Sequence, residues 1–146
     1  STVAGTLTKG MVDLAGSAAE GFVGVHYLAS WDEDVSGMKL LKEVQREYYG
    51  REINEYMYEE QFFITMLACK AIEMAIDEVS IDNLTGAAVK QYGMDKMTNF
   101  NSGGIAPPVT FTQEDHRAIR QARIVQVQDG KIKPITDWFE TPQIKP

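Results

Sequence analysis

Residues 58–79, YEEQFFITMLACKAIEMAIDEV, form the longest stretch of the sequence whose pattern indicates a single secondary structure. Apolar side chains recur at intervals of three and four residues, which predicts a helix rather than a strand. The apolar stripe covers more than half of the helix circumference, so we expect neighbours on more than one side. Charged side chains mark the part that we expect to face solvent, namely Glu59, Glu60, Lys70, Glu73 and Asp77.

Length and composition place this helix in a globular protein. The chain has 146 residues, of which 44% are hydrophobic and 24% charged, as expected for one ordinary domain. The uncharged run at 61–69 is far shorter than the about 20 residues of a membrane span. A net charge of -7 argues against binding to nucleic acid or anionic membranes, which requires clustered Lys and Arg. The opening STVAGTL has the composition of an internal segment, so we expect a trimmed part of a longer protein.

The N-terminal third predicts a helix, a strand and a second helix. A helix at 10–19 precedes Gly21, and the nearly all-apolar run at 22–28 indicates a strand that is covered on both faces. This order is typical of a parallel sheet flanked by helices. A helix at 37–49 follows, with Asp34 or Ser36 as its N-cap and Gly50 at its end.

The remainder predicts one more short helix and a terminal hairpin. We expect a helix at 80–94 capped by Asp82, a loop at 95–108 and a short strand at 108–112. Asp129 and Gly130 separate two alternating runs, a strong signal for a β-hairpin. The fold class is therefore α/β, with hinge-like stretches at 29–36 and 98–108.

No constellation of residues indicates catalysis, a metal or a cofactor. The cluster at 114–117, Glu-Asp-His-Arg, is better interpreted as a solvated turn, because the spacing of known metal and acid–base motifs is missing. His26 lies in an apolar strand, where a hydrogen-bonded core histidine is more common than a ligand-binding one. The lone Cys69 has no basic partner suited to activate it. We therefore expect no enzyme, no metal site and no cofactor.

Aromatic residues are the remaining signal for a binding site. Tyr27 and Trp31 flank the end of the predicted strand, and further aromatic side chains surround the start of the core helix. Such side chains line clefts for small organic ligands, although they also cap hydrophobic cores. Both interpretations stay open. The second group consists of Tyr56, Tyr58, Phe62 and Phe63.

The segment order resembles a known family. LAGSAAEGFVGVHYLA, MKLLKEVQREYYGREI, FFITMLACKAIEMAI, PPVTFTQEDHR and ARIVQVQDGK follow each other as in the C-terminal part of type I periplasmic solute-binding proteins, the branched-chain amino acid-binding family of ABC importers. The resemblance implies two α/β lobes that close on a ligand. It assigns 1–33 to the second lobe, 34–105 to helices of the first lobe, and 106–146 to the crossover and C-terminal hairpin of the second.

The resemblance also implies ligand contacts. The family's aromatic contact at the core helix matches Met66, with Phe62 one turn earlier, and the loop before the first helix supplies Gly5 and Thr6. In the family this loop usually carries an acidic residue for the ligand's ammonium group, but the matching position falls near Ala4. A buried ammonium without a counter-charge is costly, so we expect a small organic solute other than an α-amino acid.

The resemblance implies a solute-binding component of an ABC importer, for an amino acid or other small organic solute, that acts by hinge closure in the periplasm or at the cell surface. Its partners are a small organic ligand and the importer's permease. A ligand-sensing domain of a receptor or regulator with the same fold is the alternative. The incomplete sheet and its exposed edges further predict that this chain self-associates as a homodimer.

Overall fold

Helix α3, Tyr56–Val79, is the axis of the structure, a computed structural model that describes residues 7–142. Its buried residues recur every three or four positions and form one stripe. The helix predicted at 58–79 is confirmed, but the expected packing on several sides is not, because Ile64 and Ile72 are 45% and 40% exposed. No segment within 7–142 covers that side of α3. The buried stripe consists of Tyr56, Glu59, Phe63, Leu67, Ala71 and Ala75.

The strands form a four-stranded sheet in the order β1-β2-β3, with β4 paired to β2. All of these pairings are antiparallel, which corrects the expected parallel sheet for the described residues. The parallel expectation rested on β1, whose direction is set by its pairing with β2 far along the chain, while the turn at Asp129 and Gly130, with φ angles of 56° and 69°, makes β2 and β3 antiparallel. The α/β class and the C-terminal hairpin are confirmed. The strands are β1 Val23–His26, β2 Gln121–Gln128, β3 Lys131–Pro134 and β4 Phe139–Glu140.

The other helices agree with the predictions at their centres and differ at their ends. Helix α1 spans Lys9–Ala15 and continues as a 3-10 helix, while α2 spans Ser36–Tyr49 and ends at Gly50 with a φ of 69°. The N-cap of α2 is Val35 without a side-chain hydrogen bond, so the proposed capping by Asp34 or Ser36 is wrong. One of the free backbone N–H groups at the start of α2, that of Gly37, donates to the Gly103 carbonyl instead of to a capping side chain.

The region after α3 is irregular rather than one helix. A 3-10 turn at Ile81–Asn83 is followed by α4, Gly86–Ala88, a π-helical turn at Val89–Gly93 and a 3-10 turn at Met94–Lys96. The cap is the Thr85 side chain, which accepts from the Ala88 N–H, and not Asp82. The strand expected at 108–112 is reduced to a single bridge between Phe100 and Val109. Close packing of the π-helical turn on α3 overrides the helical pattern there.

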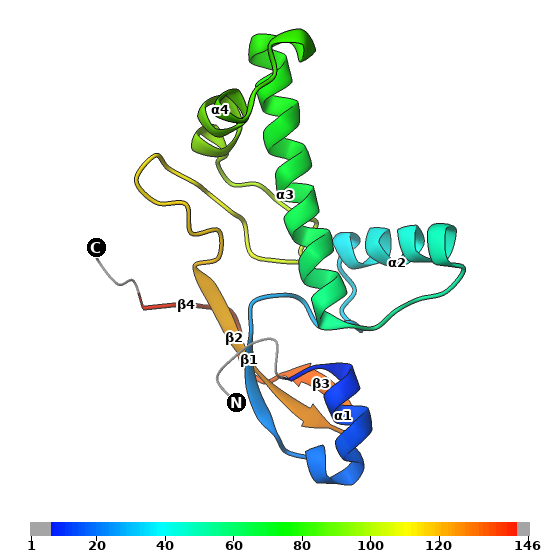
Figure 1. Cartoon of the computed structure of the whole chain (residues 1–146). Coiled ribbons are helices and arrows are strands. Elements are labelled where there is room, and N and C mark those ends of the chain that lie inside the picture. The colour runs from blue at the N-terminus through cyan, green and yellow to red at the C-terminus, as the bar shows by residue number, and fades with distance from the viewer. Residues whose placement is uncertain (1–6, 143–146) are drawn as a thin grey trace.

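The buried side chains form two separate hydrophobic clusters. The larger, which we call the helical core, joins α2, α3 and the loop at 97–111, and the smaller, the sheet core, joins α1 to β2. Figure 1 shows the two bodies one above the other, with α1 and β1–β3 beyond the N-terminal end of α3. Fully buried members are Leu28, Met38, Met97, Ile105 and Val109 in the helical core and Leu7, Val125 and Val127 in the sheet core.

The two hinge-like stretches lie side by side, and both contribute to the helical core, through Ala29 from one and Ile105 and Ala106 from the other. The Ala29 N–H donates to the Ile105 carbonyl at 2.7 Å, and the Gly37 N–H donates to the Gly103 carbonyl at 2.8 Å. Residues that are about seventy positions apart in sequence are thereby held together. The two stretches thus form one hydrogen-bonded unit.

Replacing Gly37 with alanine is expected to destabilise this unit by about 1–3 kcal/mol, the usual cost of overpacking. A Cβ at Gly37 would lie 2.2 Å from the Ser102 carbonyl oxygen and 2.6 Å from Ile105 Cγ1. The matched control is Gly86→Ala, whose Cβ would meet no atom within 4 Å. Urea unfolding of both variants measures the difference. Equal midpoints for the two variants would contradict the close approach of the two stretches.

Candidate functional site

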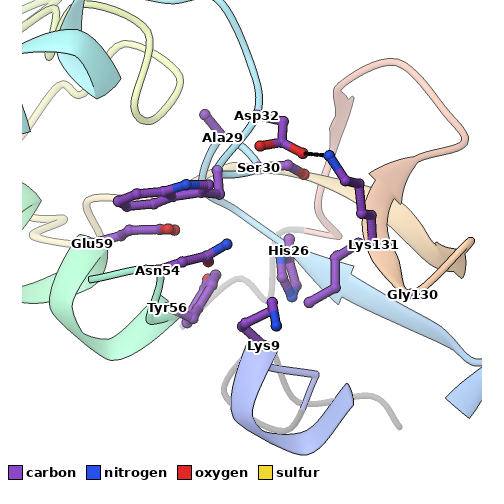
Figure 2. Close-up of a pocket in the computed structure, with 12 residues that line it drawn as sticks. Lys9, His26, Ala29, Ser30, Asp32, Asn54, Tyr56, Glu59, Gly130 and Lys131 are labelled. Atoms are coloured by element: carbon purple, nitrogen blue, oxygen red, sulfur yellow. Dashed lines mark hydrogen bonds and ion pairs between the residues drawn. The ribbon is translucent and has the colours of Figure 1, made fainter. Parts of the chain in front are cut away.

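A pocket of about 230 Å³ lies where the sheet body meets the helical body. It is lined by residues from α1, β1, the stretch after β1, the start of α3 and the β2–β3 hairpin. Figure 2 shows Glu59, Asn54 and Tyr56 on the α3 side, Lys9 and Lys131 across from them, and His26 between. The lining residues are Lys9, His26, Ala29, Ser30, Trp31, Asp32, Asn54, Tyr56, Glu59, Gly130, Lys131 and Ile132.

Aromatic side chains provide part of the wall. Trp31 and Tyr56 both line the pocket, and Tyr56 is also a buried member of the helical core, so for Tyr56 both interpretations hold. The Trp31 ring is held from outside by Lys42, whose Nζ lies 4.5 Å from the ring centroid and donates to the Trp31 carbonyl at 2.8 Å. Phe63 is 2% exposed within the helical core, so the core interpretation is correct for it.

His26, the last residue of β1, is a buried, hydrogen-bonded histidine, as interpreted from the sequence. It is 3% exposed, and its Nε2 donates to the Leu7 carbonyl at 2.9 Å. Burial lowers the pKa of His26 to about 4, an effect that the hydrogen bond to Leu7 opposes and the positive charge of Arg123 reinforces. The ring packs against Tyr56 with a centroid distance of 4.5 Å. His26 is therefore neutral at physiological pH and forms a rigid wall of the pocket.

Glu59 is the main correction to the sequence analysis at this site. It was expected to face solvent, but it is 3% exposed and belongs to the buried stripe of α3. Burial raises the pKa of its carboxyl group to about 7, the charge of Glu55 raises it further, and Lys42 opposes both. Its spacing from Tyr56 and Phe63, three residues after one and four before the other, was the signal that could have revealed this position.

The hairpin and the stretch after β1 are linked across the pocket mouth. Lys131 Nζ donates to Asp32 Oδ2 at 2.7 Å, as Figure 2 shows by a dashed line. Lys9 pairs with Asp13 on α1. Sequence reasoning missed Asn54 and Lys131, because no local pattern brings a hairpin next to the loop before α3.

The four predicted ligand contacts have different positions in the structure. Gly5 and Thr6 lie outside the described residues. Phe62 and Met66 are partly buried and pack against the helical core, and neither lines the pocket. Their role in binding a ligand stays a prediction.

The acidic and basic cluster at 114–117 lies away from the pocket in a loop. Asp115 pairs with Arg117 at 2.7 Å, and His116 Nε2 lies 2.8 Å from Asp95 Oδ1. These ion pairs agree with its interpretation as a turn. Among residues 7–142, no group of three or more His, Cys, Asp or Glu side chains is placed to hold a metal ion. Over the same range, no helix has the length and apolar character needed to cross a membrane.

Fold, pocket and sequence together define the class of protein. The pocket lies where the sheet core and the helical core meet, and its lining comes from both. The sequence pattern of the periplasmic binding protein family matches residues 2–131, and the chain belongs to this family. This confirms the resemblance stated from the sequence. A search of curated protein sequences finds no match.

Solved structures with the same fold come from ABC transporters. A valine-bound branched-chain amino acid ABC transporter protein from Thermus thermophilus is 28% identical with a TM-score of 0.81, covering 92% of this chain and 37% of that one. An ABC transporter substrate-binding protein from Aeropyrum pernix is 22% identical with a TM-score of 0.73, and the match covers 93% of this chain and 36% of that one. A fatty acid ABC transporter substrate-binding protein from Thermomonospora curvata is 20% identical with a TM-score of 0.69, and the match covers 92% of this chain and 34% of that one. The chain thus spans little more than a third of these proteins.

Proposed function

We propose that this chain is part of a solute-binding component of an ABC importer, which takes up a small organic molecule by closure of two lobes. Residues 1–33 and 106–146 contribute to one lobe, and residues 34–105 contribute helices to the other. The protein works in the periplasm or at the cell surface, delivers its ligand to the importer's permease and performs no covalent chemistry.

The position of the pocket is the observation that carries this proposal. Its lining comes from both bodies: Lys9, His26 and Lys131 belong to the sheet body, and Tyr56 and Glu59 belong to α3. A ligand that contacts both bodies binds the closed arrangement more tightly than the open one, and this difference shifts the population toward closure.

The hydrogen-bonded connections suit a hinge. The stretch at 29–36 follows β1 of the sheet body, and backbone hydrogen bonds to the stretch at 98–108 are made by Ala29 and by Gly37 at the start of α2. Because the two stretches are bonded to each other and contribute to the helical core, we expect backbone rotation at their ends rather than within them. Self-association of the chain stays a prediction, since no feature of residues 7–142 points to a contact between two copies.

Ligand binding is expected to change the fluorescence of Trp31. The sequence has two tryptophans, Trp31 and Trp138. Trp31 lines the pocket, whereas the Trp138 ring packs against Arg123, whose Cζ lies 4.3 Å from the ring centroid. In a Trp138→Phe variant, Trp31 becomes the sole tryptophan and reports on the pocket. A panel of small acids, amides, amines and amino acids is titrated into this variant, expressed at the full length that its gene encodes.

The proposal predicts that at least one compound of the panel changes this signal saturably and raises the melting temperature, because it binds the folded state only. Measured by calorimetry, which needs no tryptophan, Trp31→Ala is expected to weaken that compound's binding at least tenfold, while Trp138→Phe leaves it unchanged. Absence of any saturable response across the panel, or equal affinity in the Trp31→Ala variant, contradicts the proposal.

A further inference from the structure

Four side chains with a formal charge line the pocket, and three of them are paired. Lys131 binds Asp32, and Lys9 binds Asp13. Glu59 is the exception, because no hydrogen bond or ion pair to its carboxyl group is formed within residues 7–142. This side chain is therefore the unmatched charge of the pocket.

The cation whose charge acts on Glu59 is engaged with another residue. Lys42 acts on Glu59 through its charge, but its Nζ donates to the Trp31 carbonyl at 2.8 Å and lies over the Trp31 ring. The other charged groups that act on Glu59 are Glu55 and Glu33, both of which are negative. His26 is kept neutral by burial and supplies no positive charge. Removing a carboxylate from water without a partner is unfavourable, so this arrangement lacks a cation.

We propose that Glu59 is the counter-ion for the primary ammonium group of a small solute bound in this pocket. The inference rests on the proposed function and adds the chemical class of the ligand and the residue that selects it. An ammonium group offers three N–H donors to the carboxylate, and in a site shielded from water such a charged pair is stronger than a hydrogen bond between neutral groups.

The rest of the lining fits an aliphatic amine. Trp31 and Tyr56 present aromatic rings, which attract a cation placed near their faces. Ala29 and Ile132 provide apolar surface for a short alkyl chain. The volume of about 230 Å³ lies below the about 300–1,000 Å³ of pockets for drug-sized ligands, so the solute is small. A carboxylate ligand placed against Glu59 would instead meet an unpaired negative charge.

Three probes of matched size test the proposal: n-butylamine, butyramide and butyrate. Each is titrated into the Trp138→Phe protein and followed by Trp31 fluorescence and calorimetry. We expect n-butylamine to bind at least tenfold more tightly than butyramide, and butyrate not to bind. Because the Glu59 carboxyl has a pKa of about 7, n-butylamine should bind about tenfold more tightly at pH 8 than at pH 6, the ratio set by the fraction of carboxylate.

Glu59→Gln keeps the shape of the side chain and removes its charge. It is expected to weaken n-butylamine binding at least tenfold and to abolish the pH dependence. The matched control is Glu73→Gln, the same change at an exposed position of α3 that pairs with Lys70, and it should leave binding unchanged.

The outcomes separate this inference from the proposed function. If other compounds of the wider panel bind but n-butylamine does not, or if Glu59→Gln binds n-butylamine as tightly as the parent, the inference is overturned while the solute-binding function stands. Equal binding of butyramide and n-butylamine also overturns it. If no compound binds, both fail.

Discussion

Replacing Glu33 with alanine is expected to lower the free energy of unfolding by about 3–5 kcal/mol, the cost of leaving a buried charge without its partner. Arg123 on β2 is 4% exposed, and its Nη1 donates to Glu33 Oε2 at 2.9 Å. Burial disfavours the charge on Glu33, but hydrogen bonds from Arg123 and Ser30 outweigh it and hold the pKa of that carboxyl below its usual range. Without Glu33, the Arg123 guanidinium still donates to the Leu28 carbonyl at 3.1 Å and still lies over the Trp138 ring. Neither of these partners carries a negative charge.

Two variants make this expectation specific. Asp34→Ala removes the neighbouring carboxylate, whose pair with Lys39 is exposed, and should leave stability unchanged. Arg123→Met combined with Glu33→Ala removes both charges and is expected to recover most of the loss. Guanidinium unfolding measures all three proteins. If Glu33→Ala loses no more stability than Asp34→Ala, Arg123 is not dependent on Glu33 and the connection after β1 is not anchored to β2.

Replacing Glu59 with glutamine is expected to raise the free energy of unfolding of the ligand-free protein by about 3 kcal/mol at pH 8. This figure follows from the pKa of the Glu59 carboxyl, which is about 7 in the folded state and 4.5 in the unfolded reference. The sign follows from proton binding. Between these two pKa values the folded state holds a proton on Glu59 that the unfolded state has released, so the parent loses stability as the pH rises from 4.5 to 7. Glutamine does not titrate and avoids this loss.

His26 has the opposite effect and conceals this dependence in the parent. Its pKa of about 4 lies below the reference value of 6.5, so it removes stability as the pH falls from 6.5 to 4. The contributions of Glu59 and His26 therefore partly cancel between pH 4.5 and 6.5. The difference between the unfolding free energies of Glu59→Gln and the parent isolates Glu59, and we expect it to grow from pH 4.5 to 7 and then level off. A difference that is constant with pH, or equal to that of Glu73→Gln, contradicts the burial of an unpaired carboxyl.

The elements with strong local signals were predicted from the sequence. Helix α3 follows from its apolar spacing, α2 ends at Gly50 as expected, and Asp129-Gly130 forms the hairpin turn. The stretches at 29–36 and 98–108 were identified from composition, because glycine, proline and acidic residues do not fit a helix or a strand there.

Features that depend on long-range contacts were not predicted. The direction of β1 is set by its pairing with β2, about one hundred residues later, and a continuous apolar run does not encode that direction. Glu59 is buried where α3 meets residues from distant parts of the chain that line the same pocket, while a charged residue at a helix start normally faces water. Lys131 reaches the pocket only because the hairpin folds toward Asp32.

Small-angle X-ray scattering tests the central claim most directly, using the protein at the full length its gene encodes and a compound that saturates the Trp31 signal. Closure of two bodies around the pocket moves mass toward the centre, so we expect the radius of gyration to fall when the compound binds and to recover when it is dialysed away. A radius of gyration that stays the same at full saturation would contradict solute binding by hinge closure.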